Sequence, residues 1–318
     1  MISGSRLSLP RGLSAETIAR SYFALQALAG AAWWGSVFTL PVVRTATLGE
    51  LDPVAVAVLD VPLFVVASAL VAVLPRRAAR WAAGTAAGWT LAVAALLAVY
   101  ATVTTLAGCG VVIMIAASIA SAGAWLLLVL GRIPTEWLLV GPFAFRPARP
   151  RTTPLAHVLA TAGQIVVFWG LFLIVLPLII RALEARWSLM LPLPVGVVVA
   201  GIVIVMVASA LGVWSAAAMT MNGDGTPLPS AMPNRLVVAG PYRFVRNPMA
   251  LAGIAQGVGV GLTLSSWMVV VYALTGSLVW NYAIRPHEEA DLAASFGDDY
   301  RAYARAVGCW VPRLHPMG

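Results

Sequence analysis

Long apolar stretches separated by short polar ones dominate this chain. A helix needs about 20 apolar residues to cross the hydrocarbon core of a bilayer. Stretches that meet this requirement are 20–41, 53–74, 81–107, 110–130, 154–180 and 194–220. A further apolar run, 249–284, is too long for one helix and is interrupted at Leu264-Ser265-Ser266, which predicts a hairpin of two short helices. We therefore predict an all-α polytopic transmembrane protein with about eight spans.

Composition supports this class and excludes most soluble ones. The chain is 61% hydrophobic and 10% charged, against roughly 25% charged residues in ordinary soluble domains. The net charge of +8 is explained by arginines at helix ends, so we expect no nucleic-acid partner. Arginines before the first span resemble those of a signal peptide. That span is longer than a signal core and contains Trp33-Trp34, so we expect a retained helix.

Arginines also indicate the topology. They gather in alternate loops, at Arg76, Arg77 and Arg80, at Arg132, Arg146, Arg149 and Arg151, and at Arg235, Arg243 and Arg246. The positive-inside rule places these loops and both termini in the cytoplasm. We expect the plasma membrane of a bacterium.

Polar chemistry divides the chain into two parts. Residues 1–152 form a four-span module in which Asp60 is the notable polar group. An intramembrane carboxylate is a functional candidate, although protonation or bonding to backbone freed by Pro62 would also explain it. Residues 153–318 hold the remaining spans and all the motifs. Cys109 and Cys309 lack metal-ligand or CxxC spacing, so we expect no metal site.

The segment Gly240-Pro241-Tyr242-Arg243-Phe244-Val245-Arg246-Asn247-Pro248-Met249 carries the densest polar pattern. Asn is a preferred N-cap and Pro is favoured at the first helical position, so a helix should begin here. Its free amides and positive dipole end would attract a carboxylate or phosphate. A plain cap with snorkelling arginines is the alternative. Within this helix Gly253, Gly257 and Gly261 form a stripe that would let the preceding span approach closely.

The C-terminal region continues the pattern. Pro286 should stop the second hairpin helix, and Glu288–Phe296 should form a short amphipathic cytoplasmic helix closed by Gly297. A favourable interaction with the helix dipole would explain one acidic residue at this helix start. It explains the pair Glu288 and Glu289 less well. Paired acids could hold ribose hydroxyls or a cationic cofactor.

These motifs, together with Phe296-Gly297-x-x-Tyr300-x-x-Tyr303 and Val311-Pro312, resemble the isoprenylcysteine carboxyl methyltransferase family over roughly residues 222–315. Bacterial relatives and phospholipid N-methyltransferases share the pattern. The resemblance implies a membrane methyltransferase that uses S-adenosylmethionine at the cytoplasmic face and a lipophilic small molecule or lipid that enters from the bilayer. It implies these cofactor-binding residues: Asn234, Arg235, Leu236, Val237, Gly240, Tyr242, Asn247, Pro248, Met249, Ala250 and Glu288.

Departures from the family concern the substrate more than the cofactor. The family often has histidine at the position of Asn247 and tyrosine at that of Ala250. The family's acceptor-binding arginine aligns with Ile284, and we transfer that role to Arg285. Methyl transfer needs alignment more than acid–base work. Arg246 or Arg285 could orient an anionic acceptor, and Glu289 could take the proton of an amine.

The sequence is also compatible with two other classes of protein. Membrane sterol reductases have a similar C-terminal helical pattern but bind NADPH. A transporter or scaffold would depend chiefly on the first four spans and on Asp60.

Overall fold

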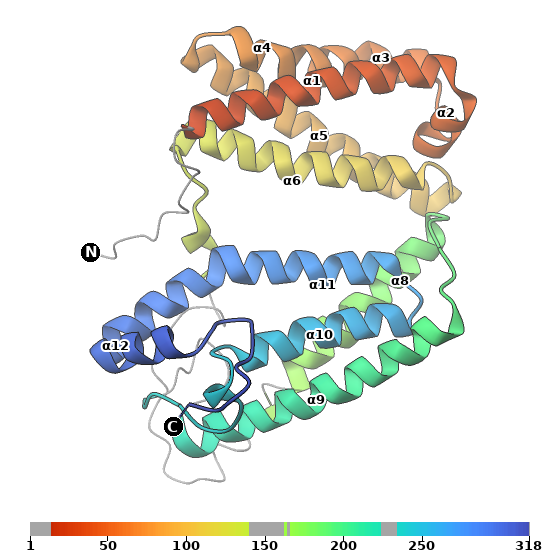
Figure 1. Ribbon diagram of the computed structural model, residues 1–318. Helices are drawn as coiled ribbons and strands as arrows, with labels where there is room; N and C mark the ends of the chain where they lie inside the picture. The colour runs from red at the N-terminus through yellow and green to blue at the C-terminus, as the bar shows by residue number, and fades with distance from the viewer. Residues whose placement is uncertain (1–13, 140–161, 164–165, 224–233, 318) are drawn as a thin grey trace. The chain divides into compact units, whose positions relative to one another are not determined.

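The computed structural model describes residues 14–139, 162–163, 166–223 and 234–317. Regular secondary structure within these ranges is entirely helical, which confirms the predicted fold class (Figure 1). The chain divides into two compact units. The N-terminal unit contains residues 14–134 and 183–189, and the C-terminal unit contains the described parts of 135–182 and 190–317. The boundary expected at residue 152 and the start of the expected span 154–180 lie outside the described residues.

Apolar helices at the expected places build the N-terminal unit. They are α1 (Ala15–Thr39), α2 (Pro41–Leu48), α3 (Pro53–Asp60), η1 (Val61–Val66), α4 (Ala67–Val73), α5 (Arg76–Thr104) and α6 (Gly108–Leu130). A bend of 113° separates α1 from α2, and Pro41 begins the second helix because its missing amide costs nothing there. The segments α3, η1 and α4 form one 21-residue helix, Pro53–Val73. The π-helical turn η1 accommodates Pro62, which has no amide to donate and would clash within a regular α-helix.

Arginine side chains donate hydrogen bonds to the last carbonyls of two helices in this unit. The Arg20 guanidinium donates to the carbonyls of Val71, Ala72 and Leu74 at the end of α4. Arg80 donates in the same way to Leu128 at the end of α6. The last carbonyls of a helix have no partner within the helix, so these contacts stabilise both ends.

The C-terminal unit is built on four apolar helical segments and a polar one. Its elements are η2 (Thr135–Leu138), a helix from Val166 that contains η4 (Gly170–Val175) and α8 (Leu176–Arg186), α9 (Val195–Gly223), η6 (Gly240–Arg243), α10 (Pro248–Thr263), α11 (Trp267–Val279), η7 (Trp280–Ile284) and α12 (Arg285–Ala306). The last residues of α8, from Leu183, belong to the N-terminal unit. Figure 1 shows α10 between α9 and α11.

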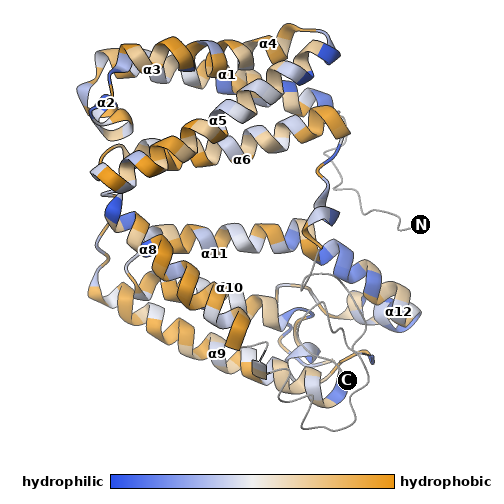
Figure 2. Ribbon diagram, turned by 180° about the vertical axis from the view of Figure 1, so that it is seen from behind, coloured by the Kyte–Doolittle hydropathy of each residue, from blue (hydrophilic) through white to orange (hydrophobic). Residues whose placement is uncertain are grey.

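Six helices in the described chain are long and apolar enough to cross a membrane, and a seventh candidate results if α1 and α2 count as one broken span. The remaining expected span corresponds to α10, whose 16 residues measure about 24 Å along the helix axis. The protein is therefore a multi-span helical membrane protein (Figure 2).

The hairpin predicted at Leu264-Ser265-Ser266 is present. Ser265 has a positive φ of 51°, and the Ser266 hydroxyl caps α11 by accepting from the Val269 amide at 3.2 Å. A short loop and a side-chain cap thus return the chain directly beside α10.

Glycine packing in the hairpin differs from the prediction. A Cβ at Gly257 would lie 2.9 Å from the Ala273 Cβ, and one at Gly261 would lie 2.7 Å from the Val270 amide, so both face α11. The predicted contact with the preceding span was wrong for this stripe. Gly259 makes that contact instead, because its added Cβ would lie 2.9 Å from the Gly201 carbonyl of α9.

The prediction that Pro286 stops the second hairpin helix was also wrong. Helical structure runs through η7 from Trp267 to Ala306, because the wider π turn before Pro286 accommodates a ring that would clash in a regular α-helix. The helical backbone continues past Pro286, but the side chains change from apolar to charged. The apolar part ends near Ile284, and the charged α12 extends beyond it (Figure 2). Gly297, with φ 55° and ψ −126°, interrupts α12 as expected.

Candidate functional site

The start of α10 is fixed by its own cap. The Asn247 Oδ1 accepts from the Ala250 amide at 3.2 Å, and Pro248 occupies the first helical position. The Leu251 amide already donates to the Asn247 carbonyl. Among the first residues of α10, only Met249 has a backbone amide for which the described residues provide no hydrogen-bond partner. The predicted helix start is confirmed, but far fewer free amides remain for an anion than the sequence suggested.

Arg246, immediately before this cap, lies at the centre of a charged cluster. Its guanidinium is 3.3 Å from a Glu289 carboxylate oxygen and donates to the Tyr300 hydroxyl at 3.4 Å. Its backbone amide donates to the Gly308 carbonyl at 2.9 Å. Its Nε is buried and has no hydrogen-bond partner among the described residues. Since a buried donor without a partner is costly, this atom is a candidate ligand contact.

Arg285 joins the same cluster from α12. Its guanidinium is 3.4 Å from the same Glu289 oxygen, and it donates to the Asn281 carbonyl at 3.4 Å. Ile284, the residue that strict alignment places in the acceptor-binding position, is buried. The three residues expected to be catalytic, Arg246, Arg285 and Glu289, therefore lie together. Two guanidinium groups share one carboxylate, which leaves the cluster with excess positive charge.

Glu288 differs from its neighbour Glu289. Burial, followed by the nearby Glu289 charge, raises the pKa of Glu288 to about 7, and Arg285 opposes this shift. No ion pair of Glu288 is present among the described residues. A carboxyl group that ionises near neutral pH and lacks a cationic partner is poised to accept a cation or ligand hydroxyls.

Tyr242 connects this region to the loop before α10. Burial first, and Glu288 second, raise the pKa of the Tyr242 phenol well above its ordinary value. The Tyr242 carbonyl accepts from the Tyr303 hydroxyl at 2.7 Å. Tyr242 also packs with Val237 and Ala218 in a small apolar cluster.

The rest of the predicted cofactor segment lies along the same loop. Asn234 and Arg235 are exposed, and their amides donate to the Gly223 carbonyl at the end of α9. Leu236 packs against the cluster of Tyr300, Tyr303 and Val307. These residues hold the loop between the end of α9 and α12.

Gly240 has a structural reason to be glycine. Its φ is +54°, and a Cβ there would lie 3.1 Å from the Trp214 Nε1 and 3.2 Å from the Ala218 Cβ. Backbone in the left-handed region and close approach to α9 both favour glycine. This close packing orders the turn that leads to Tyr242 and Arg246.

The C-terminal residues form a strap over this loop. The Arg313 amide donates to the Phe244 carbonyl at 2.9 Å, and the Met317 amide donates to the Arg243 carbonyl at 3.0 Å. The Arg243 side chain returns a bond to the Met317 carbonyl at 2.7 Å. Arg243 is thereby committed to structure, whereas Arg246 remains directed into the charged cluster.

Sequence reasoning missed two tryptophans and underestimated Tyr300. The Trp310 indole donates to the Asn281 Oδ1 at 2.8 Å, and the Trp280 Nε1 is buried with no partner among the described residues. The sequence marked Tyr300 only as part of the Phe296-Gly297-x-x-Tyr300 motif, yet its hydroxyl accepts a hydrogen bond from Arg246. The i, i+3 tyrosine pair gave a hint of Tyr300. Nothing in the pattern distinguished Trp280 from an interfacial tryptophan.

Metal ligands do not gather anywhere in the part of the chain that the structure describes, where no group of three His, Cys, Asp or Glu residues could hold an ion. Burial raises the pKa of the Cys309 thiol, against the effect of Arg285. This shift favours the protonated thiol over the nucleophilic thiolate.

The fold and this site define a class: a multi-span helical membrane protein with a cluster of charged side chains at the polar end of a helical hairpin. Residues 196–299 match the family model of the phospholipid methyltransferases. The match runs from α9 to α12 and includes Arg246, Arg285, Glu288 and Glu289. The chain therefore carries a phospholipid methyltransferase family domain, which indicates a membrane methyltransferase and confirms the resemblance. The search of curated proteins gave no match.

Proposed function

We propose that the C-terminal unit transfers a methyl group from S-adenosylmethionine to a lipophilic acceptor that enters from the bilayer. The observation that carries this proposal is the cluster of Arg246, Glu289 and Arg285, with Glu288 beside it, within the family-matched segment. The arginine distribution supports a cytoplasmic site and cytoplasmic termini in a bacterial plasma membrane.

The residues present fit this cofactor chemically. S-Adenosylmethionine carries a carboxylate, an ammonium, a sulfonium and two ribose hydroxyls. Arg246, with a buried donor that has no partner among the described residues, is suited to the carboxylate. Glu288, without an ion pair among the described residues, is suited to the hydroxyls or to a positive group. When bound, the cofactor supplies an electrophilic methyl group, and the displacement chemistry is its own.

The protein contributes position and charge. Arg285, at the junction of the apolar helix with α12, would orient an anionic acceptor at the membrane boundary. Glu289 would keep both guanidinium groups in place, because a carboxylate between two arginines restricts both side chains. The excess positive charge favours a carboxylate or thiolate acceptor, which needs no base. An amine acceptor would instead use Glu289 to take its proton.

Calorimetry on the purified full chain tests the proposal. S-Adenosylmethionine and its demethylated product should bind the wild type, and Glu288→Ala should weaken binding about tenfold or more. Asp291→Asn is the matched control, because Asp291 is an exposed acid on the same helix. It should bind as the wild type does. Binding of NADPH in place of these ligands, or of neither, would overturn the proposal.

A further inference from the structure

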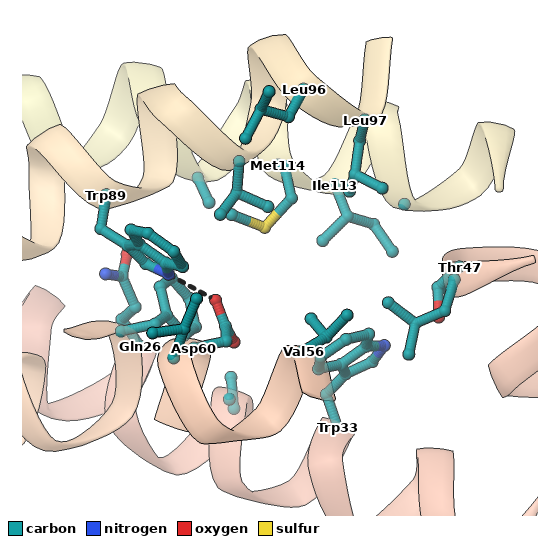
Figure 3. A pocket seen from close by; sticks show the side chains of 18 of the residues that line it. Gln26, Trp33, Thr47, Val56, Asp60, Trp89, Leu96, Leu97, Ile113 and Met114 are labelled. Carbon is teal, nitrogen blue, oxygen red and sulfur yellow. Dashed lines mark hydrogen bonds between the residues drawn. The ribbon is translucent and has the colours of Figure 1, made fainter. Parts of the chain in front are cut away.

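The N-terminal unit contains a large cavity that the methyltransferase site does not use. Its volume is about 670 Å³, and its lining comes from α1, α2, α3, η1, α5 and α6, all within this unit (Figure 3). Protein interiors are normally close-packed, with few voids larger than a water molecule. The volume lies in the range of small-molecule sites, about 300–1,000 Å³.

Asp60 gives this apolar cavity a single carboxylate. Its side chain lines the cavity, and the residue is 5% exposed. One carboxylate oxygen accepts from the Trp34 Nε1 at 2.9 Å, and the other accepts from the Trp89 Nε1 at 2.7 Å. Figure 3 shows Asp60 hydrogen-bonded to Trp89, with Met114 and Ile113 of α6 in the lining of the same cavity.

Neutral indoles are the only hydrogen-bond partners of Asp60 within the described chain. No ion pair of the described residues includes Asp60, and no arginine or histidine lines the cavity. A carboxylate accepts at about four lone-pair positions, so each oxygen can accept further. Two N–H donors hold the carboxyl group at the cavity, and no cation among the described residues would neutralise its ionised form.

Gln26, another polar residue of the lining, needs no ligand. The Gln26 amide donates to the Ser68 hydroxyl at 3.0 Å, and its carbonyl oxygen accepts from Ser121 at 2.8 Å and from Tyr22. This network is internally satisfied. Asp60 is the one carboxyl group of the lining, and its ionised form therefore calls for a ligand of opposite charge.

Aromatic rings and exposed apolar residues also line the cavity. Rings that line the cavity are those of Tyr22, Trp33, Phe64, Trp89 and Tyr100. Aromatic faces attract cations as well as apolar groups. The lining residues Leu25, Leu59, Leu96 and Ile113 are each more than half exposed, as expected where a cavity communicates with the apolar surface of the unit.

We propose that the N-terminal unit binds a lipophilic cation, an amine or quaternary ammonium on an apolar body, with its positive charge against the Asp60 carboxylate. An acyl chain alone would fill the apolar space but leave the carboxylate uncompensated, at the cost that a buried charge carries. The proposal is independent of the methyltransferase reaction, since every residue that carries it lies in the N-terminal unit.

The test uses the full chain in phosphatidylcholine nanodiscs and two probes with the same alkyl chain. Radiolabelled dodecyltrimethylammonium is cationic, and dodecyldimethylamine N-oxide carries no net charge at neutral pH. Empty nanodiscs measure partition into lipid. The wild type should bind the cation saturably and about tenfold or more tightly than the N-oxide.

Variants separate the charge from the space. Asp60→Asn should lose the preference for the cation. Asp52→Asn is the matched control, because Asp52 is an exposed cap of α3 and asparagine caps equally well. Met114→Trp should fill the cavity and abolish saturable binding while leaving Asp60 and its indole partners in place. Equal binding of both probes by the wild type, or an unchanged cation affinity in Asp60→Asn or in Met114→Trp, would overturn the proposal.

Discussion

Adjacent carboxyl groups of α12 have different surroundings. Glu289 lies between two guanidinium groups, whereas Glu288 has a pKa raised to about 7 by burial and by Glu289 itself. A raised carboxyl pKa means that the folded state favours the protonated form. Its stabilising contribution is complete below the unfolded pKa and is lost as the pH rises through the folded value.

Glu288→Gln should consequently change stability and ligand binding in opposite directions. At about pH 8 it should stabilise the ligand-free protein by roughly 1–3 kcal/mol, because the folded state no longer has to ionise a buried group. At about pH 5 it should have little effect on stability. Cofactor affinity should fall at both pH values. Thermal unfolding in detergent and calorimetry measure the two quantities, and equal stabilisation at both pH values would contradict the assignment.

Asn247 offers a second test at the residue scale. Asn247→Ala removes the cap of α10 and should destabilise the protein by about 1 kcal/mol, whereas Asn247→Asp keeps an accepting oxygen and should retain most of that stability. The added negative charge beside Arg246 should nevertheless weaken cofactor binding in Asn247→Asp. Thermal unfolding and calorimetry on both variants separate the cap from the site. If both variants lose the same stability, the cap has no measurable role.

At the element scale, the hairpin of α10 and α11 depends on close backbone approach. Gly261 lies where a Cβ would meet the Val270 amide at 2.7 Å, and Gly253 has open space around its Cβ direction. The two glycines belong to the same stripe and the same helix. They therefore form a matched pair.

Gly261→Ala should destabilise the protein by about 1–3 kcal/mol, because the added methyl group forces α10 and α11 apart. Gly253→Ala should be neutral or slightly stabilising, because alanine is the better helix former. Thermal unfolding of both variants in the same detergent provides the comparison. Equal destabilisation would show that the glycines act through backbone flexibility instead of packing.

At the scale of the whole molecule, the orientation in the membrane can be tested with the two native cysteines. The predicted topology places Cys109 outside the cell and Cys309 in the cytoplasm. Cys109 is exposed in the structure, and Cys309 is partly buried. A membrane-impermeant maleimide should label the Cys309→Ser variant in intact cells. It should label the Cys109→Ser variant only after permeabilisation, and the reverse pattern would invert the topology.

The sequence by itself determined the helical class, the hairpin turn at Ser265-Ser266 and the start of α10 at Asn247. These features depend on local patterns: apolar length, a capping side chain and a proline, all read within a few neighbouring residues. It also identified Arg246 and Glu289 as candidates from their chemistry, and Arg285 from the resemblance. The family match at residues 196–299 confirms the resemblance and leaves the roles of the three residues as predictions.

Only the tertiary structure decided what those residues contact. Pairing of Arg246 with Glu289 joins positions far apart in the chain, and no local pattern specifies that distance. Gly257 faces α11 because of how the neighbouring helices pack, which composition does not reveal. The helix continues through Pro286 because a π turn precedes it, which composition does not reveal either. Asp60 shows the same division: its sequence marks an expensive buried charge, and the fold alone supplies the two indoles and the cavity beside it.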